Sequence, residues 1–193
     1  MGFSKGDRQS VGILTKQHND IPYEGFRPRL TGGLRKLGML DPTDTIEAHI
    51  RSDEQDWAFG SLVRCTLAKG GRKSGTIIPS STNAQTYATW RNKCTDLYVP
   101  KLPPRLQVVV MLSNDDAYVT ACRERITELH PSTRKINSVA YGDGRVTSVH
   151  IIHFGGQGFN HMGDWMAGAN NKAGLKGKLA VQAVRQALRQ VPQ

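Results

Sequence analysis

The sequence is poor in cysteine and has no long apolar run. Its three cysteines, Cys65, Cys94 and Cys122, lie far apart among 193 residues and form no CxxC pair. This usage predicts neither a disulfide framework nor a zinc finger, and it fits reduced thiols in a cytoplasm. No stretch approaches the roughly 18 consecutive apolar residues of a membrane span, and "MGFSKGDRQS" lacks the apolar core of a signal peptide. We therefore expect a cytoplasmic protein with no membrane partner.

Acidic residues are scarce as well. Only 16 Asp and Glu stand against 26 Lys and Arg, which gives a formal net charge of +10. Such an excess favours contacts with phosphates through counterion release and speeds the encounter with a polyanion. The composition predicts a nucleic-acid partner, and the alternative is a basic protein without one.

Strand and helix patterns alternate along the chain. Residues 57–67 and 106–113 are β-rich and nearly continuous in apolar residues, which is typical of strands buried on both faces. Helical periodicity is present in residues 27–40, where two adjacent glycines weaken it, and in residues 176–191. The alternation predicts a three-layer αβα sandwich with a mostly parallel central sheet, in a single domain of residues 1–193.

The second half of the chain carries the clearest local signals. Residues 114–129 follow the second strand at once as a helix capped by Asn114 or Asp115. Two further β segments flank a "GDG" turn, and the second of them ends at His153. Ligands of open α/β sheets bind where strands end at their carboxyl edge, so His153 is a candidate site residue.

The order of these pieces resembles that of the uracil-DNA glycosylase superfamily. Its members carry a motif after the first strand, a segment that stacks on the base, a strand bearing Asn, an apolar strand and a final His-Pro-Ser-Pro loop. The matching stretches are "GFSKGD" (2–7), "EGFRPRLTGGL" (24–34), "FGSLVRC" (59–65), "LQVVVMLSNDDAYV" (106–119) and "HFGGQGFNHMGDW" (153–165). The resemblance covers almost the whole chain. It implies that superfamily's fold and the removal of uracil from DNA by a monomer that needs no metal or cofactor.

The resemblance also assigns roles to individual residues. The catalytic residues it implies are His153, Ser4 and Asp7. The residues implied to hold the base are Gly6, Phe26, Phe59 and Ser61. The residues implied to contact single- or double-stranded DNA are Lys5, Arg64, Lys69, Arg72, Gly156, Gln157, Phe159, Asn160 and His161.

These roles follow from the chemistry of base excision. Breaking the N-glycosidic bond leaves negative charge on the departing base, which a neutral His153 can stabilise by donating a hydrogen bond. The base must first leave the duplex, and Phe26 is the candidate for stacking on it, with Phe59 as the alternate. Residues 157–162 then form a wedge that fills the vacated stack.

The sequence departs from the family pattern at several positions. Ser4 stands where many members have the Asp or Asn that positions the attacking water, and Asp7 is a substitute for it. Ser61 falls where the family often has the Asn that reads uracil, so the protein could accept a broader range of damaged bases. The final loop keeps His153 but replaces Pro-Ser with "FGG". The chain begins almost on the first motif, so we expect either that this sequence starts after the strand that normally precedes this motif or that this edge of the sheet is rebuilt.

Simpler interpretations accompany each of these signals. His153 can be a strand-end histidine satisfied by a backbone carbonyl, and Phe26 and Phe59 can be core aromatics. "LHPSTRK" (129–135) matches the family's His-Pro-Ser string more literally, but His130 follows a helix and not a buried strand, and a proline is common after the end of a helix. We therefore interpret this string as unrelated to the family's final loop. The alternative functions are a non-catalytic nucleic-acid-binding protein on the same scaffold and an enzyme acting on free nucleotides.

Overall fold

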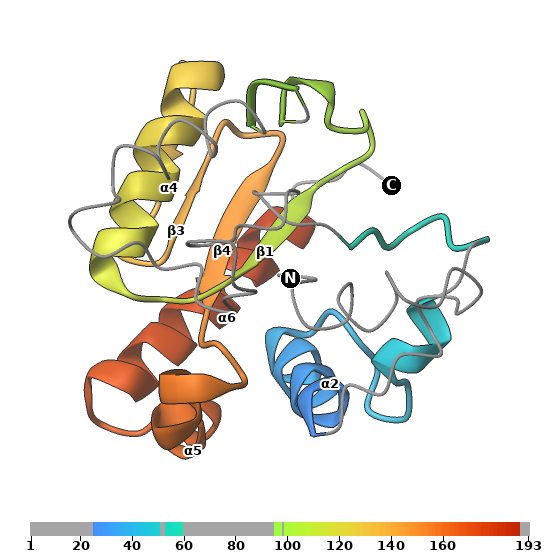
Figure 1. Ribbon diagram of the computed structural model, residues 1–193, viewed down its shortest axis with the longest axis vertical. Helices are drawn as coiled ribbons and strands as arrows, with labels where there is room; N and C mark the ends of the chain where they lie inside the picture. The colour runs from blue at the N-terminus through green and yellow to red at the C-terminus, as the bar shows by residue number, and fades with distance from the viewer. Residues whose placement is uncertain (1–24, 51–52, 60–94, 98, 190–193) are drawn as a thin grey trace, which may run out of the picture. The chain divides into compact units, whose positions relative to one another are not determined.

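The computed structural model describes residues 25–50, 53–59, 95–97 and 99–189 (Figure 1). Of these, residues 25–49 and 102–189 belong to one unit and the others to a second, smaller one. The single domain expected over residues 1–193 stays a prediction. No helix in the described ranges is both long enough and apolar enough to cross a membrane.

A four-stranded mixed sheet lies in the larger unit. Its strands are β1 (Val108–Leu112), β2 (Arg134–Lys135), β3 (Ala140–Gly142) and β4 (Thr147–Ile151), in the spatial order β1-β4-β3-β2 (Figure 1). β1 and β4 are parallel, with Val110 opposite Val149, whereas β4 with β3 and β3 with β2 are antiparallel. The α/β class is confirmed, and the prediction of a mostly parallel sheet is wrong.

A tight hairpin explains the antiparallel pairing of β3 and β4. Gly144 has φ +91°, a conformation that favours glycine. Asp143 accepts hydrogen bonds at Oδ1 from the backbone N–H groups of Arg145 at 3.0 Å and Val146 at 2.7 Å. The "GDG" turn predicted here is therefore confirmed. A connection this short leaves no room for the crossover that parallel neighbours need.

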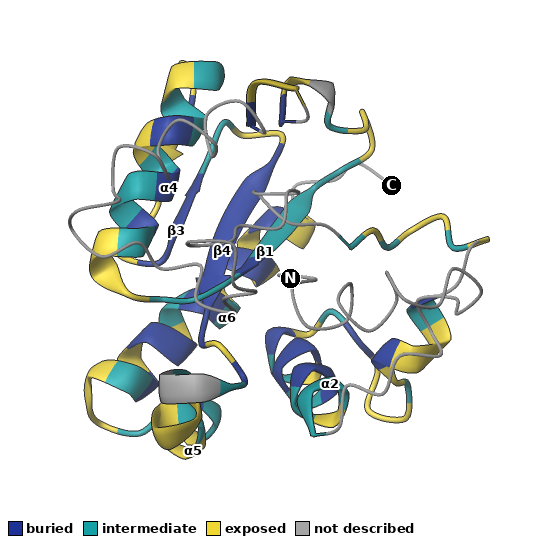
Figure 2. Ribbon diagram, in the orientation of Figure 1, coloured by how far each residue is buried: buried dark blue, intermediate teal, exposed yellow. Residues whose placement is uncertain are grey.

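β4 is buried along its whole length (Figure 2). Successive side chains of a strand point to opposite faces, so Val149 and Ile151 share one face and Ser148 and His150 share the other. Helix α6 (Lys172–Arg189) packs against β4 and lies behind it in Figure 1. The buried residues of α6 include Ala180, Val184 and Ala187, which form the apolar face that the sequence predicts.

The predicted strand–helix unit of residues 106–129 is confirmed by β1 and α4 (Asp116–Leu129). Asp115, one of the two expected caps, accepts a hydrogen bond at Oδ1 from the backbone N–H of Tyr118 at 3.0 Å. His130 caps the other end of α4, where its N–H donates to the carbonyl of Ile126 at 2.8 Å. The prediction that His130 follows a helix and not a buried strand is therefore confirmed.

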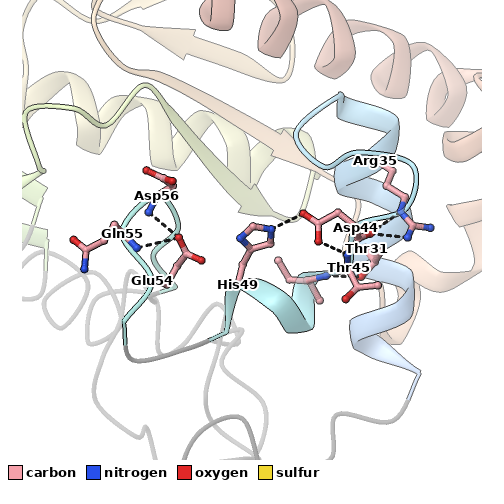
Figure 3. A network of polar contacts seen from close by, with 9 residues as sticks. Thr31, Arg35, Asp44, Thr45, His49, Glu54, Gln55 and Asp56 are labelled. Carbon is pink, nitrogen blue, oxygen red and sulfur yellow. Dashed lines mark hydrogen bonds and ion pairs between the residues drawn. The ribbon is translucent and has the colours of Figure 1, made fainter.

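Helix α2 (Phe26–Leu37) confirms the helix predicted within residues 27–40, and it ends at Gly38 with φ +76°. A network of polar contacts joins α2 to the segment that follows it, residues 44–49 (Figure 3). Arg35 donates two hydrogen bonds to the carbonyl of Asp44, at 2.6 and 2.9 Å. The Asp44 carboxylate lies 2.7 Å from His49 Nε2, and this hydrogen bond is the main cause that lowers the pKa of Asp44. The network ties the last turns of α2 to the short 3-10 helix η2 (Ile46–His49).

The smaller unit is described only in short segments. Glu54 Oε1 accepts hydrogen bonds from the backbone N–H groups of Gln55 at 2.9 Å and Asp56 at 2.8 Å, which fixes a turn (Figure 3). Residues 57–59, the beginning of a predicted strand, are not in a strand, and residues 60–67 lie outside the described ranges. Residues 95–97 are helical, and η4 (Val99–Lys101) follows them.

Candidate functional site

The parallel strands β1 and β4 end together at one edge of the sheet. Leu112, the last residue of β1, pairs with Ile151, the last residue of β4. The N–H of Ser113 donates to the carbonyl of Ile151 at 2.9 Å, so the two following loops leave from the same point. This carboxyl edge is where α/β sheets bind their ligands. We call it the carboxyl edge below.

His153 lies two residues beyond β4 and is exposed. Its Nδ1 is 3.0 Å from the backbone N–H of Gly155 and 2.9 Å from the carbonyl of the same residue. When Nδ1 is unprotonated it accepts the Gly155 N–H, and the neutral ring then carries its proton on Nε2. Within the described ranges no protein group is hydrogen-bonded to Nε2, so this tautomer presents a free donor at the carboxyl edge. When Nδ1 carries the proton it donates to the carbonyl, which is the simpler interpretation made from the sequence.

Phe26 is brought next to His153, as the resemblance implies. It occupies the first turn of α2, and its ring centroid lies 6.0 Å from that of His153 with an interplanar angle of 51°. The Phe26 ring also contacts Phe154 edge-on at 6.4 Å. Phe26 is half-buried, so it is neither a full core residue nor a free surface one. Two of the predicted site residues therefore meet, although they come from opposite halves of the chain.

Phe154 packs beneath the contact between Phe26 and His153, in the protein core. Its side chain is fully buried, and its ring packs edge-on against Trp165 of α5 (Met162–Ala167) at 6.3 Å. Gly33 of α2 lies so close to the Phe154 ring that a Cβ atom on Gly33 would overlap it. Arg29 adds a hydrogen bond from Nη1 to the carbonyl of Phe154 at 3.3 Å. The second of the adjacent glycines in α2 thus lets the helix approach the loop.

The predicted wedge is helical and not an open loop. Residues Gly156–His161 form the 3-10 helix η5, and Met162 begins α5. Phe159 is 46% exposed, and the guanidinium carbon of Arg29 lies 4.4 Å from its ring centroid, a cation–π contact that orients the ring. Asn160 and His161 are exposed beside it. A Cβ atom on Gly158 would collide with the carbonyl of His153, so η5 folds back closely on the histidine.

The other predicted site residues lie outside the described ranges, contribute only their backbone to η5, or belong to the smaller unit. The residues that lie outside the described ranges are Ser4, Lys5, Gly6, Asp7, Ser61, Arg64, Lys69 and Arg72. Gly156 and Gln157 contribute their backbone to η5. Phe59 is half-buried in the smaller unit, and its role stays a prediction.

A buried polar cluster beneath the carboxyl edge was not foreseen from the sequence. His150 is fully buried in β4; its Nδ1 lies 2.9 Å from the carbonyl of Ser113 and its Nε2 lies 3.1 Å from the hydroxyl of Tyr141. Burial lowers the pKa of His150 to about 4, so the ring is neutral, donates from Nδ1 and accepts at Nε2. Burial also raises the pKa of Tyr141, which stays protonated and donates. A histidine inside an otherwise buried strand is the signal that identifies such a cluster.

Ser113 holds an unusual backbone conformation between these groups. Its φ is +118°, which is rare for a residue with a side chain and is typical of functional or constrained positions. Its N–H bond to Ile151 and its carbonyl bond to His150 hold it there. The end of β1 is therefore fixed from both sides.

A second unforeseen cluster ties the loop after β1 to α6. Lys176 is buried and donates from Nζ to the carbonyl of Asn114 at 2.5 Å and to Asp116 Oδ1 at 2.6 Å. Lys172 contacts Asp116 Oδ2 at 2.7 Å. The hydrogen bonds from Lys172 and then Lys176 lower the pKa of Asp116 to about 2. The contacts join α6 to the first turn of α4 beside the carboxyl edge.

No three His, Cys, Asp or Glu side chains of the described ranges lie close enough together to hold a metal ion. Comparisons of the chain with models of protein families, with curated proteins and with solved structures give no match.

Proposed function

We propose that this chain is a monofunctional DNA glycosylase that removes uracil, and other damaged bases of similar shape, from DNA. The observation that carries the proposal is the meeting of Phe26 and His153 at the carboxyl edge, with centroids 6.0 Å apart. An aromatic ring for stacking and a hydrogen-bond donor for the base are the two groups that a flipped base needs.

The proposed reaction is hydrolysis of the bond between C1′ of the sugar and N1 of uracil. The bond breaks with its electron pair going to the base, and the oxygen of a water molecule bonds to C1′. The proton that this water loses neutralises the uracil anion. His153 in its Nε2–H tautomer donates to the developing oxyanion of uracil, and the Gly155 N–H, which donates to Nδ1 at 3.0 Å, stabilises that tautomer. Positioning of the water by Ser4 or Asp7 remains part of the proposal.

The surroundings of this pair support DNA as the substrate. Phe159 is exposed on a short helix next to His153, and Arg29 fixes the orientation of its ring. An aromatic side chain held rigidly beside a base pocket suits insertion into the stack that the flipped base leaves. The net charge of +10 favours binding to phosphates.

The proposal includes the scaffold of the uracil-DNA glycosylase superfamily, a three-layer sandwich. β1 and β4 would be its central parallel pair. The packing of α6 on β4 and the contact of Tyr118 in α4 with His150, at 5.7 Å between ring centroids, support helical layers around them. The antiparallel β3 and β2 then extend one side of that sheet.

The test is a single-turnover excision assay with an oligonucleotide that contains one uracil. We expect His153→Ala to slow excision by about 10²- to 10³-fold, the effect of removing one preorganised donor, and to leave DNA affinity within a few-fold of the wild type. His130→Ala is the matched control, because it removes an imidazole from the far end of α4, about 20 Å along the helix from the carboxyl edge. Equal rates for wild type and His153→Ala would remove His153 from the mechanism.

A second candidate is a non-catalytic protein that binds nucleic acid with the same surface. The 2.9 Å contact of His153 Nδ1 with the Gly155 carbonyl favours it, since a proton on Nδ1 leaves no donor on Nε2 of the neutral ring. This candidate predicts DNA binding without release of any base by the wild type.

A further inference from the structure

An open, basic groove runs between α2 and α6, and its residue Lys36 lies over the ring of Trp165, with Nζ 5.7 Å from the ring centroid. Its volume is about 690 Å³, and four of the residues that line it are cations. Those cations are Lys36 of α2 and Lys178, Arg185 and Arg189 of α6. Gln182 and Gln186 supply further polar groups, and Val181 is the apolar residue of the lining. We call this the α2–α6 groove.

The cations of α6 form a line. Lys178, Arg185 and Arg189 are spaced by seven and four residues, so they share one face of the helix, and all three are exposed. At 1.5 Å per residue the line is about 16 Å long. One strand of a DNA duplex carries a phosphate about every 3.4 Å along the axis, so roughly five phosphates pass along this length. A single small anion would meet only one part of the line.

The positive charge of the groove is not neutralised within the described ranges. The ion pairs recorded there join His49 to Asp44, Arg125 to Glu128, and Lys172 and Lys176 to Asp116. None of them includes a groove cation. Partial burial, and after it the charges of Lys178 and Arg185, lower the pKa of Lys36. These side chains repel one another, and an anion in the groove would relieve the repulsion.

We propose that the α2–α6 groove binds the phosphate backbone of DNA as a second contact surface, in addition to Phe26 and His153 at the carboxyl edge. The choice of DNA rests on the proposed function. Helix α2 links the two places, since Phe26 lies in its first turn and Lys36 in its last, about 15 Å apart along the axis. A short DNA duplex is long enough to span this distance.

The test compares two charge-matched double variants. Lys178→Gln with Arg185→Gln removes two groove cations, and Lys135→Gln with Arg123→Gln removes one Lys and one Arg from β2 and α4. The Kd for a labelled 20-base-pair duplex without uracil is measured by fluorescence anisotropy from 50 to 200 mM salt. Each lost phosphate contact reduces the magnitude of the negative slope of log K against log salt by about 0.9. We therefore expect the slope of the groove variant to be smaller in magnitude by about 1.8 than that of the wild type. Across that fourfold salt range the wild type should then weaken about 12-fold more than the groove variant.

An unchanged slope, or an equal loss of slope in the control variant, would overturn the proposal. Vesicles with 30% phosphatidylserine test the other anionic partner: if the groove variant loses vesicle binding while its DNA slope is unchanged, the groove recognises lipid and the proposal is wrong. The duplex contains no uracil, so the result is independent of excision. Failure of the wild type to release uracil would refute the proposed function and leave the groove measurement unaffected.

Discussion

Lowering the pH from 7 to 4 should destabilise the protein through His150. This ring is fully buried and already uses both nitrogens, with Nδ1 donating to the carbonyl of Ser113 and Nε2 accepting from the hydroxyl of Tyr141. Protonation would bury a charge and turn Nε2 into a second donor facing a hydroxyl that must then reorient. Burial accordingly lowers the pKa of His150 from 6.5 to about 4.

The size and direction of the effect follow from these two pKa values. The unfolded chain binds a proton at His150 near pH 6.5, whereas the folded chain binds it only near pH 4. Between these values the unfolded state holds more protons, so the free energy of unfolding falls as the pH falls. The stabilisation is fully present above pH 6.5 and is lost as the pH falls through 4. The loss between pH 7 and pH 4 is about 3 kcal/mol, a large part of the 5–15 kcal/mol typical of domains.

Urea unfolding followed by circular dichroism at pH 7, 5.5 and 4 measures this effect. His150→Gln is the comparison, because glutamine keeps a polar side chain and does not titrate. We expect the wild type to lose about 3 kcal/mol more than the variant between pH 7 and pH 4. Titration of groups common to both proteins cancels in the difference, and Asp116, with its pKa of about 2, titrates mainly below this range. The same pH dependence in both proteins would refute the reasoning.

Three further variants test the packing and the wedge. Gly33→Ala should destabilise the protein by about 1–2 kcal/mol, because the new methyl group overlaps the buried Phe154 ring. Gly32→Ala, whose Cβ would lie 3.7 Å from Met166, should be neutral or stabilising by up to about 1 kcal/mol. Thermal unfolding measures both variants, and equal Tm shifts would contradict the close approach of Gly33 to Phe154. Phe159→Ala should slow excision from duplex DNA more than from single strands, since only a duplex needs a wedge; equal losses in the excision assay would count against that role.

The elements that could be predicted from the sequence are those fixed by local chemistry. Asp115 caps α4 because a short carboxylate can reach the backbone N–H two or three residues on. The hairpin around Gly144 follows from the positive φ that glycine allows, and Ala180 and Val184 of α6 are buried because the helical period places them on one face. The sheet direction could not be predicted in this way. A strand buried on both faces, such as β4, can have one parallel and one antiparallel neighbour, and residue pattern does not distinguish them.

The candidate site was predictable only in part. The nearness of Phe26 and His153 was expected from a family resemblance and from no spacing rule, because the two residues come from distant parts of the chain. The contacts of Arg29 with Phe159 and of Lys176 with Asp116 join residues far apart in sequence and depend on how the helices pack. Cation–π contacts and ion pairs of this kind are common, so the residue types do not identify which residues pair. The pairs are known only from the three-dimensional structure.

The helical form of residues 156–161 shows the same limit. Three glycines at positions 155, 156 and 158 favour a loop in the sequence, yet the segment forms η5. Close packing of Gly158 against the backbone of His153 needs a residue without a side chain there. The glycine that suggests an open loop thus permits a compact turn beside the histidine.

The release of free uracil is the measurement that tests the central claim most directly. Purified protein is incubated with single-stranded and duplex oligonucleotides that contain one uracil, and the products are separated by chromatography before and after alkali. The account predicts free uracil together with strand breaks that appear only after alkali, and a loss of both in His153→Ala. DNA binding with no free uracil from either substrate would contradict it and would favour the non-catalytic binding protein.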